Sequence, residues 1–259
     1  MVNATYFTYD GISSAAYGLQ IAAFSGSDSD SVEENESFSP SLTTVKAPSL
    51  LRFYHGGVIY ESAPECEFTV VSSSIITPGN RAAIFRWLVG RNEFKPLVFL
   101  ESDLSAFTYY CVFTSVSTIY VNGVCHGFKL TATFDSPFAR GKPTVATTQS
   151  GTNAVQVINN SDIMDGYTYP TVSFVGSSIS IVNTTDDTGR EFAFSGLGDS
   201  EQTTVDCEAK TIRSNLGGEK LSNFTSKKWL RLRRGINNLI VTATGDVTIT
   251  CPYYAMIGY

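Results

Sequence analysis

The sequence predicts a mainly β protein with two domains, and three observations carry this prediction. Charged residues make up only 16% of the 259 residues, which disfavours coiled coils and helical repeats because both need charged flanks. Hydrophobic residues make up 42% and aromatic residues 12%, enough to form a core. Short β-prone runs alternate with turn residues along most of the chain, as in proteins built from antiparallel strands.

The first domain is expected to open with a hairpin. Residues 5–9 are aromatic and β-prone, and Asp10-Gly11 is a strong turn pair because glycine adopts positive φ without strain. An apolar run at 17–24 follows, and residues 25–40 are polar, acidic and aperiodic, which predicts a long exposed loop. The next strands are expected at 50–60 and 65–72.

One helix is expected over about residues 78–89. Thr77 is a suitable N-cap, Pro78 fits the first turn and Gly90 is a suitable stop. Apolar residues recur on one face, with Trp87 at its edge. Such a helix, roughly 18 Å long, can cover one face of a small sheet. Strands are expected after it at 96–100, 108–116, 119–121 and 128–134, with Asn122-Gly123 as the turn before the last of them.

A domain boundary is expected at residues 140–154, which contain few large apolar residues and are rich in Thr, Gly and Pro. This places a first domain at 1–140, a linker at 141–154 and a second domain at 155–259. In the second domain, turn residues separate the apolar segments at the spacing of an all-β sandwich. The expected strands are 155–159, 171–174, 178–182, 191–194, 203–206, 211–214, 228–232, 238–244 and 247–253.

The charge balance disfavours sequence-specific nucleic-acid binding, because the formal net charge is −6 and proteins that grip phosphates are normally basic. The acidic excess lies mostly in residues 1–140, which hold 13 acidic and 8 basic side chains. The five cysteines are widely spaced and odd in number, which indicates reduced thiols. No secretory leader and no membrane-spanning run are expected.

The candidate catalytic and metal sites are weak, and we expect no enzyme, cofactor or metal. The only histidines are His55 and His126; His126 follows Cys125, but neighbours on a strand point to opposite faces. The phosphate-loop pattern fails because Ser136 replaces the first glycine and Pro143 follows Lys142. The acidic residues of 28–36 lack EF-hand spacing. The pair Asp186-Asp187 lies in a turn that offers little burial.

Residues 227–234 form the one basic cluster, KKWLRLRR. On a strand, Leu230 and Leu232 would share one face and Trp229, Arg231 and Arg233 the other. We favour a half-buried strand with a solvated outer face, and the alternative is a surface for nucleic acid or an acidic partner. The turn that ends this segment is assigned to Gly235 and Asn237, with a structural role.

The order of several short motifs resembles the distal tail proteins of long, flexible-tailed bacteriophages (siphophages), which form the baseplate hub. The motifs are YDGI at 9–12 with YGL at 17–19, WL at 87–88, YY at 109–110, FDSP at 134–137, VDC at 205–207, WLRL at 229–232 and GIN at 235–237. The stretch 25–47 is longer and more acidic than this family leads one to expect. The family-like structural positions are Asp10, Gly11, Gly18, Trp87, Leu88, Tyr109, Tyr110, Pro137, Asp206, Leu232, Gly235 and Asn237.

The resemblance implies a structural virion protein at the tip of the phage tail, assembled in the host cytoplasm and not inserted into a membrane. Its first domain would be a tail-tube-like β-sandwich, or belt, with one helix that forms a hexameric ring. Its second domain would be a galectin-like sandwich similar to carbohydrate-binding modules. The ring would join the tail tube protein to the tip hub, fibre or receptor-binding proteins and pass DNA through its bore.

Two hypotheses follow for the surfaces of such a protein. The acidic bias of residues 1–140 would line the bore and repel DNA phosphates, and Tyr109 and Tyr110 would be available for ring contacts. The alternative function is a lectin-like carbohydrate-binding protein that acts through the second domain. In that case Tyr167, Tyr169 and Trp229 would stack on sugar rings.

Overall fold

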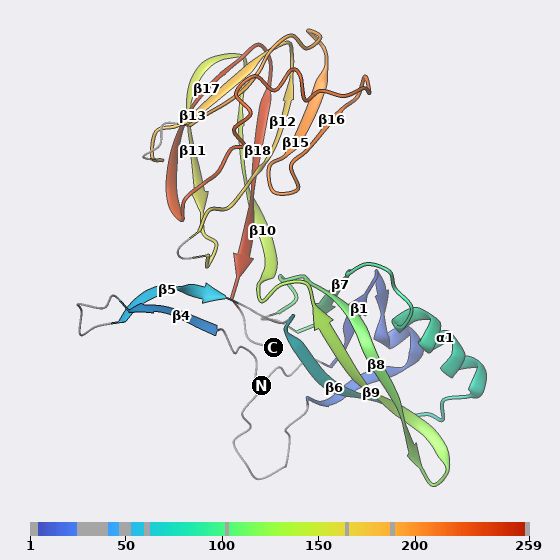
Figure 1. The fold of residues 1–259 in the computed structure, drawn as a ribbon. Helices are drawn as coiled ribbons and strands as arrows, with labels where there is room; N and C mark the ends of the chain where they lie inside the picture. Colours follow the sequence, from blue (N-terminus) through green and yellow to red (C-terminus); the bar gives the residue numbers. More distant parts are fainter. Residues whose placement is uncertain are drawn as a thin grey trace. The chain divides into compact units, whose positions relative to one another are not determined.

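The computed structural model describes residues 5–24, 41–46, 53–59, 63–101, 104–163, 166–186 and 190–256. The chain divides into two compact units, one of Met1–Ala139 with Met256–Tyr259 and one of Arg140–Ala255. Each unit has its own hydrophobic core. Figure 1 shows that both units are built mainly of strands, as the sequence predicts. The expected exposed loop, residues 25–40, lies outside the described residues.

The first unit contains a seven-stranded antiparallel sheet in the order β2-β1-β7-β8-β9-β6-β3. Its strands are β1 (Phe7–Tyr9), β2 (Ile12–Ser13), β3 (Leu19–Phe24), β6 (Glu65–Ser72), β7 (Lys95–Phe99), β8 (Tyr109–Val121) and β9 (Val124–Phe134). A short 3-10 helix, η1 (Ser14–Tyr17), connects β2 to β3. The segments expected at 108–116 and 119–121 are one continuous strand, β8.

Two turn pairs determine the hairpins of this sheet. Asp10-Gly11 joins β1 to β2 with φ angles of 51° and 77°, and Asn122-Gly123 joins β8 to β9 with φ angles of 51° and 80°. Positive φ at both central residues is the two-residue turn whose twist matches that of the flanking strands. Both expected turns are therefore confirmed, because this requirement is local and visible in the sequence.

The seven-stranded sheet folds over on itself. Strands β1 and β6 are four strand spacings apart in the sheet order, which would separate them by about 19 Å if the sheet were flat. The ring centroids of Phe7 on β1 and Phe68 on β6 nevertheless lie 5.6 Å apart. The expected sandwich of the first domain is thus one curled sheet, whose inner face is filled by aromatic rings.

Helix α1 (Pro78–Leu88) confirms the expected helix. The Thr77 hydroxyl accepts a hydrogen bond from Asn80 N at 3.3 Å, as an N-cap does. Trp87 is not at the edge of the buried face: it is 3% exposed, and its indole N–H donates to the Tyr9 carbonyl at 2.9 Å. Its ring stacks on Phe7 and Tyr17, so this side chain fixes the helix to β1 and η1.

A separate two-stranded ribbon is formed by β4 (Ser41–Lys46) and β5 (Phe53–Ile59), which pair antiparallel. Strand β5 lies within the strand expected at 50–60. Strand β4 was not expected, because its residues directly follow the acidic stretch and carry no clear alternation of apolar and polar side chains.

The second unit is a sandwich of two antiparallel sheets that face each other across the second core (Figure 1). Their strand orders are β10-β18-β12-β15-β16 and β11-β17-β13-β14. The strands are β10 (Ala139–Thr148), β11 (Gly151–Asn159), β12 (Thr171–Val175), β13 (Ile179–Asn183), β14 (Glu191–Phe194), β15 (Gln202–Asp206), β16 (Thr211–Ser214), β17 (Gly235–Ala243) and β18 (Val247–Ala255). This confirms the expected sandwich.

Two expectations for the second half of the chain are wrong. Residues 141–154 are no linker, since β10 and β11 occupy nearly all of them. These two strands are the edge strands of two different sheets and contain few large apolar side chains, so this part of the sequence resembled a loop. Residues 228–232 form no strand apart from one bridge between Leu232 and Thr168, because side chains from elsewhere in the chain bind this backbone, as described below.

Candidate interaction surfaces

Three buried asparagines hold the basic segment 231–235 in its non-strand conformation. Asn159, Asn183 and Asn237 are each 2% exposed or less. Asn183 donates a hydrogen bond to the Arg231 carbonyl at 3.2 Å, and Asn159 donates to the Leu232 carbonyl at 3.4 Å. The Arg233 carbonyl accepts from both Asn159 and Asn237. These amides satisfy backbone groups that a neighbouring strand would otherwise pair.

Asn237 links this network together. Its side-chain oxygen accepts from the Arg233 backbone N–H at 2.9 Å and from Asn183 Nδ2 at 3.0 Å. Gly235, at the start of β17, has a φ of 88°, which favours glycine. The structural role expected for Gly235 and Asn237 therefore has a specific form: they turn the chain and close a polar network inside the sandwich.

Arg231 is held by an ion pair inside this unit. Its Nε and Nη2 atoms donate to the two carboxylate oxygens of Asp186 at 2.7 and 3.2 Å, and its guanidinium lies 3.9 Å from the centroid of the Tyr167 ring. The bond to Asp186 raises the pKa of Arg231 further. Asp186 is only 3% exposed, so the sequence-based expectation that its turn offers little burial is wrong. Asp187 lies outside the described residues.

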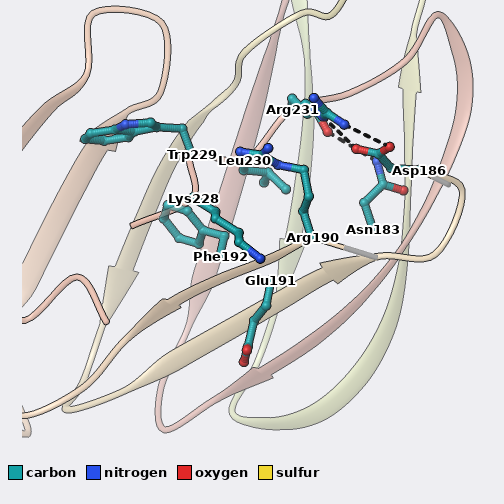
Figure 2. A pocket seen from close by; sticks show the side chains of 9 residues that line it. All are labelled: Asn183, Asp186, Arg190, Glu191, Phe192, Lys228, Trp229, Leu230 and Arg231. Carbon is teal, nitrogen blue, oxygen red and sulfur yellow. Dashed lines mark hydrogen bonds and ion pairs between the residues drawn. The ribbon is translucent and has the colours of Figure 1, made fainter. Parts of the chain in front are cut away.

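A pocket lies between this segment and β14 (Figure 2). The pocket and the open solvent directly in front of it together make up about 190 Å³. Trp229 is at one end and Asp186 with Asn183 at the other, while Arg190 and Lys228 extend between them (Figure 2). The remaining lining residues are Glu191, Phe192, Leu230 and Arg231.

The first unit carries an exposed apolar surface at the end of the β8–β9 hairpin. Ile75, Tyr120 and Val121 are 58%, 53% and 51% exposed. The Ile76 N–H donates to the Cys125 carbonyl at 2.9 Å, which places the chain at 75–76 beside the hairpin, where Cys125 pairs with Tyr120. We call Ile75, Tyr120 and Val121 the hairpin-end patch.

The hairpin that bears this patch has two further properties of an interface element. Residues 112–128 contain no Asp, Glu, Lys or Arg. In the described part of the chain, β7 accompanies β8 only as far as Cys111, so the edge of β8 beyond that point has no strand partner. An open strand edge without charges is a template for pairing with another chain.

Comparison with known proteins decides the family. Residues 2–136 match the model of a phage tail protein N-terminal domain, and residues 140–251 match that of a phage tail C-terminal domain. The chain belongs to this phage tail protein family. No curated protein matches the sequence significantly.

The fold of this phage tail protein is that of a distal tail protein. It is similar to the crystal structure of Dit from phage SPP1, described as a paradigm of the hub adsorption apparatus in phages that infect Gram-positive bacteria. The TM-score is 0.68 and the sequence identity 17%, with 96% of this chain and 98% of that chain covered. The resemblance read from the sequence is thereby confirmed, and the chain is a structural protein of the phage tail.

Most of the family-like positions of the tail protein serve its turns and cores. Tyr109 is 2% exposed and therefore not available for ring contacts, contrary to expectation, while Tyr110 is half-buried. Gly18 ends η1 with a φ of 66°. The buried positions are Trp87, Leu88, Tyr109, Leu232 and Asn237; the others are Asp10 and Gly11 in the first turn, Gly18, Tyr110, Pro137 between β9 and β10, Asp206 at the end of β15, and Gly235.

The aromatic residues assigned to sugar stacking are mostly engaged within the tail protein. Tyr167 is covered by Arg231, and Tyr169 packs against the second core. Trp229 contacts Phe224 at 4.9 Å between ring centroids and also lines the pocket. Lys228 belongs to the basic cluster seen in the sequence, whereas sequence reasoning missed Arg190, which only the fold brings to Trp229.

The environment of the thiols is unsuited to nucleophilic chemistry. Burial raises the pKa of Cys66 and of Cys207 to about 12 and that of Cys251 to about 11, and it also raises the pKa of Cys111. These thiols are protonated at neutral pH, whereas the thiolate is the nucleophile. No described helix is long and apolar enough to cross a membrane.

Proposed function

We propose that this tail protein forms a hexameric ring at the distal end of the phage tail, where it joins the tail tube protein to the tip and receptor-binding proteins. The observation that carries the proposal is the hairpin-end patch on a charge-free, open-edged hairpin of the first unit. Contacts between different faces of identical subunits close into rings when the rotation allows it. Obligate contacts of this kind bury about 2,000 Å² or more.

In this proposal residues 1–140 are the belt that builds the ring, and DNA passes through its bore. Of the 13 acidic residues in this part of the chain, seven lie outside the described residues. Three of the others, Asp10, Glu67 and Glu93, are paired with Arg91, Lys129 and Lys95. These three carboxylates are therefore partly neutralised, and a ring whose lumen is neutral or basic would contradict this part of the proposal.

The experiment that tests the ring is a measurement of molar mass. Size-exclusion chromatography with light scattering is expected to give about six times the chain mass of 28.1 kDa, and electron micrographs of the purified protein are expected to show annular particles. A monomer mass at every concentration, together with a monomer inside assembled tails, would contradict the proposal.

The second candidate function is carbohydrate binding by the sandwich. The observation that favours it is the pocket beside Trp229, since small-ligand sites combine an aromatic wall with a few convergent polar groups. The pocket is small and partly open to solvent, so a sugar unit would lie across its mouth and not inside it.

A further inference from the structure

The charge inside the pocket is not balanced by its own acidic residues. Both oxygens of Asp186 receive hydrogen bonds from Arg231, and a carboxylate oxygen of Glu191 accepts from the Ser180 hydroxyl at 2.7 Å. Among the described residues, neither Arg190 nor Lys228 has an ion pair or a side-chain hydrogen bond. Two cationic side chains therefore face the same space with their charges unpaired.

Arg190 carries the clearest unsatisfied polar group facing this space. Its Nε atom is buried and has no hydrogen-bond acceptor among the described residues. A buried donor left without an acceptor keeps its full desolvation cost, and such groups in native proteins call for an explanation such as a bound ion or ligand. An anionic oxygen placed beside Arg190 would satisfy this donor and the charge together.

The other end of the pocket supplies a surface of different chemistry. Trp229 is half-buried against Phe224 and presents its indole at the end away from Asp186 (Figure 2). A ligand bound at the mouth of the pocket would therefore combine an anionic group, placed beside Arg190, with a compact body that has a flat apolar face. A phosphate or carboxylate attached to a sugar ring has both parts, and a free inorganic anion has only one.

We propose that this pocket binds an anionic group carried on a single sugar ring. Arg190 and Lys228 contact the anion, and the ring lies against Trp229. The inference rests on the carbohydrate-binding candidate and does not depend on the hexameric ring. Sugar binding and the molar mass of each variant are therefore measured separately, so that loss of binding can be distinguished from loss of the ring.

The two tryptophans of the chain provide the readout. In full-length protein labelled with 5-fluorotryptophan, Trp87 and Trp229 give two fluorine signals, which a Trp229→Phe variant assigns. Glucose 1-phosphate and glucuronate are the anionic probes, with glucose and inorganic phosphate as the incomplete ones. We expect both anionic sugars to shift the Trp229 signal and to leave Trp87 unchanged, because Trp87 is buried in the other core. The two probes distinguish phosphate from carboxylate as the anion source.

The variants Arg190→Gln and Lys228→Gln are each expected to weaken binding about tenfold, the size of a lost hydrogen bond to a charged group. The matched controls Arg213→Gln and Lys142→Gln remove exposed cations elsewhere in the same unit and are expected to leave binding unchanged. Urea midpoints show whether each variant is folded.

Several results would overturn the proposal. They are the absence of a Trp229 shift with either anionic sugar, unchanged affinity in folded Arg190→Gln and Lys228→Gln, and glucose binding as tight as that of glucose 1-phosphate. If inorganic phosphate bound as tightly as the sugar phosphate, the assignment of Trp229 as a sugar contact would be wrong.

Discussion

At the scale of single residues, the charge balance of the second unit depends on Asp186. Its carboxylate holds Arg231 by two hydrogen bonds, and Arg233 Nη2 lies 3.9 Å from Oδ1. The carboxylate is nearly inaccessible, while the Arg231 side chain is 16% exposed. Removing the acid leaves a partly buried guanidinium without this partner, which is costly even where the intact pair contributes little net stability.

We therefore expect Asp186→Asn to lower the free energy of unfolding of the second unit by about 2 kcal/mol, below the 3–5 kcal/mol of fully buried pairs because water reaches Arg231. Urea denaturation followed by the fluorescence of Trp229 measures this change. The control is Asp246→Asn, whose side chain is exposed, with an expected change within about 0.5 kcal/mol. Equal stability of the two variants would show that the pair is dispensable.

Glu201 is a second buried acid, 2% exposed, that holds loops together. It accepts hydrogen bonds from Gly198 N at 2.9 Å and Ser214 Oγ at 2.5 Å and pairs with Lys220 at 2.8 Å. These bonds, that from Gly198 first, lower the pKa of Glu201 from its usual 4.5 to about 2. The unfolded chain therefore takes up this proton at higher pH than the folded chain does.

Because the pKa is lowered in the folded state, the stability that Glu201 contributes is fully present above about pH 4.5 and is lost as the pH falls towards 2. We expect the urea midpoint of Glu201→Gln to be lower than that of the wild type at pH 7. At pH 3 the two midpoints are expected to lie closer together. Glu219→Gln, an exposed acid nearby, is the control. A difference between Glu201→Gln and the wild type that stayed constant from pH 7 to pH 3 would contradict this assignment.

At the scale of elements, the β6–β9 pairing depends on a close approach at Gly127. A Cβ atom there would lie 2.3 Å from the Val70 carbonyl oxygen, which belongs to the backbone and cannot rotate away. We expect Gly127→Ala to destabilise the first unit by about 2–3 kcal/mol, as overpacked sites do. Thermal unfolding monitored by Trp87 fluorescence measures it.

The matched control is Gly79→Ala at the start of α1. The nearest atom to a Cβ at this position, Thr77 Oγ1, is 4.0 Å away. Alanine also favours the helix by up to about 1 kcal/mol. This variant is therefore expected to be neutral or more stable, and opposite signs for the two glycines would support the close approach. A neutral Gly127→Ala would mean that β6 and β9 are further apart.

The elements that were predictable from the sequence are those specified by neighbouring residues. The turns at Asp10-Gly11 and Asn122-Gly123 require positive φ, and Thr77 with Pro78 begins the helix, so each signal lies within a few positions. Residues 228–232 show the opposite case. They alternate as a strand does, but amides from Asn159 and Asn183 bind the adjoining carbonyls. These two asparagines are 73 and 48 residues away in the sequence, so no local pattern contains the contacts.

The candidate site was less predictable for the same reason. Trp229 and the basic cluster stand out in the sequence, whereas Arg190 is an isolated arginine near a turn. Its place in the pocket follows from the pairing of β14 with β13. The burial of Asp186 follows from Arg231, 45 residues further along the chain.

At the scale of the whole molecule, the two units offer different kinds of surface. The first unit presents an uncharged, open-edged hairpin, and the second presents a small pocket with unpaired cations. A surface for permanent self-association is depleted in charge at its core, whereas a pocket for an anion needs charge. These surfaces therefore support the two proposals made above, assembly through the first unit and ligand binding by the second.

The hairpin-end patch allows assembly to be tested without disturbing either core. Val121 and Ile75 are exposed, while Tyr120 accepts a hydrogen bond from Arg81 at 2.6 Å and is left intact. In the double variant Ile75→Asp/Val121→Asp, the subunit contact would have to desolvate two carboxylates, so the molar mass is expected to fall from about six chains to one at micromolar concentration.

Leu216→Asp, at a position that is 67% exposed in the second unit, is the control and is expected to keep the wild-type mass. Unchanged Trp87 fluorescence would show that the first unit remains folded, and a double variant that still assembled would place the ring contact on another face.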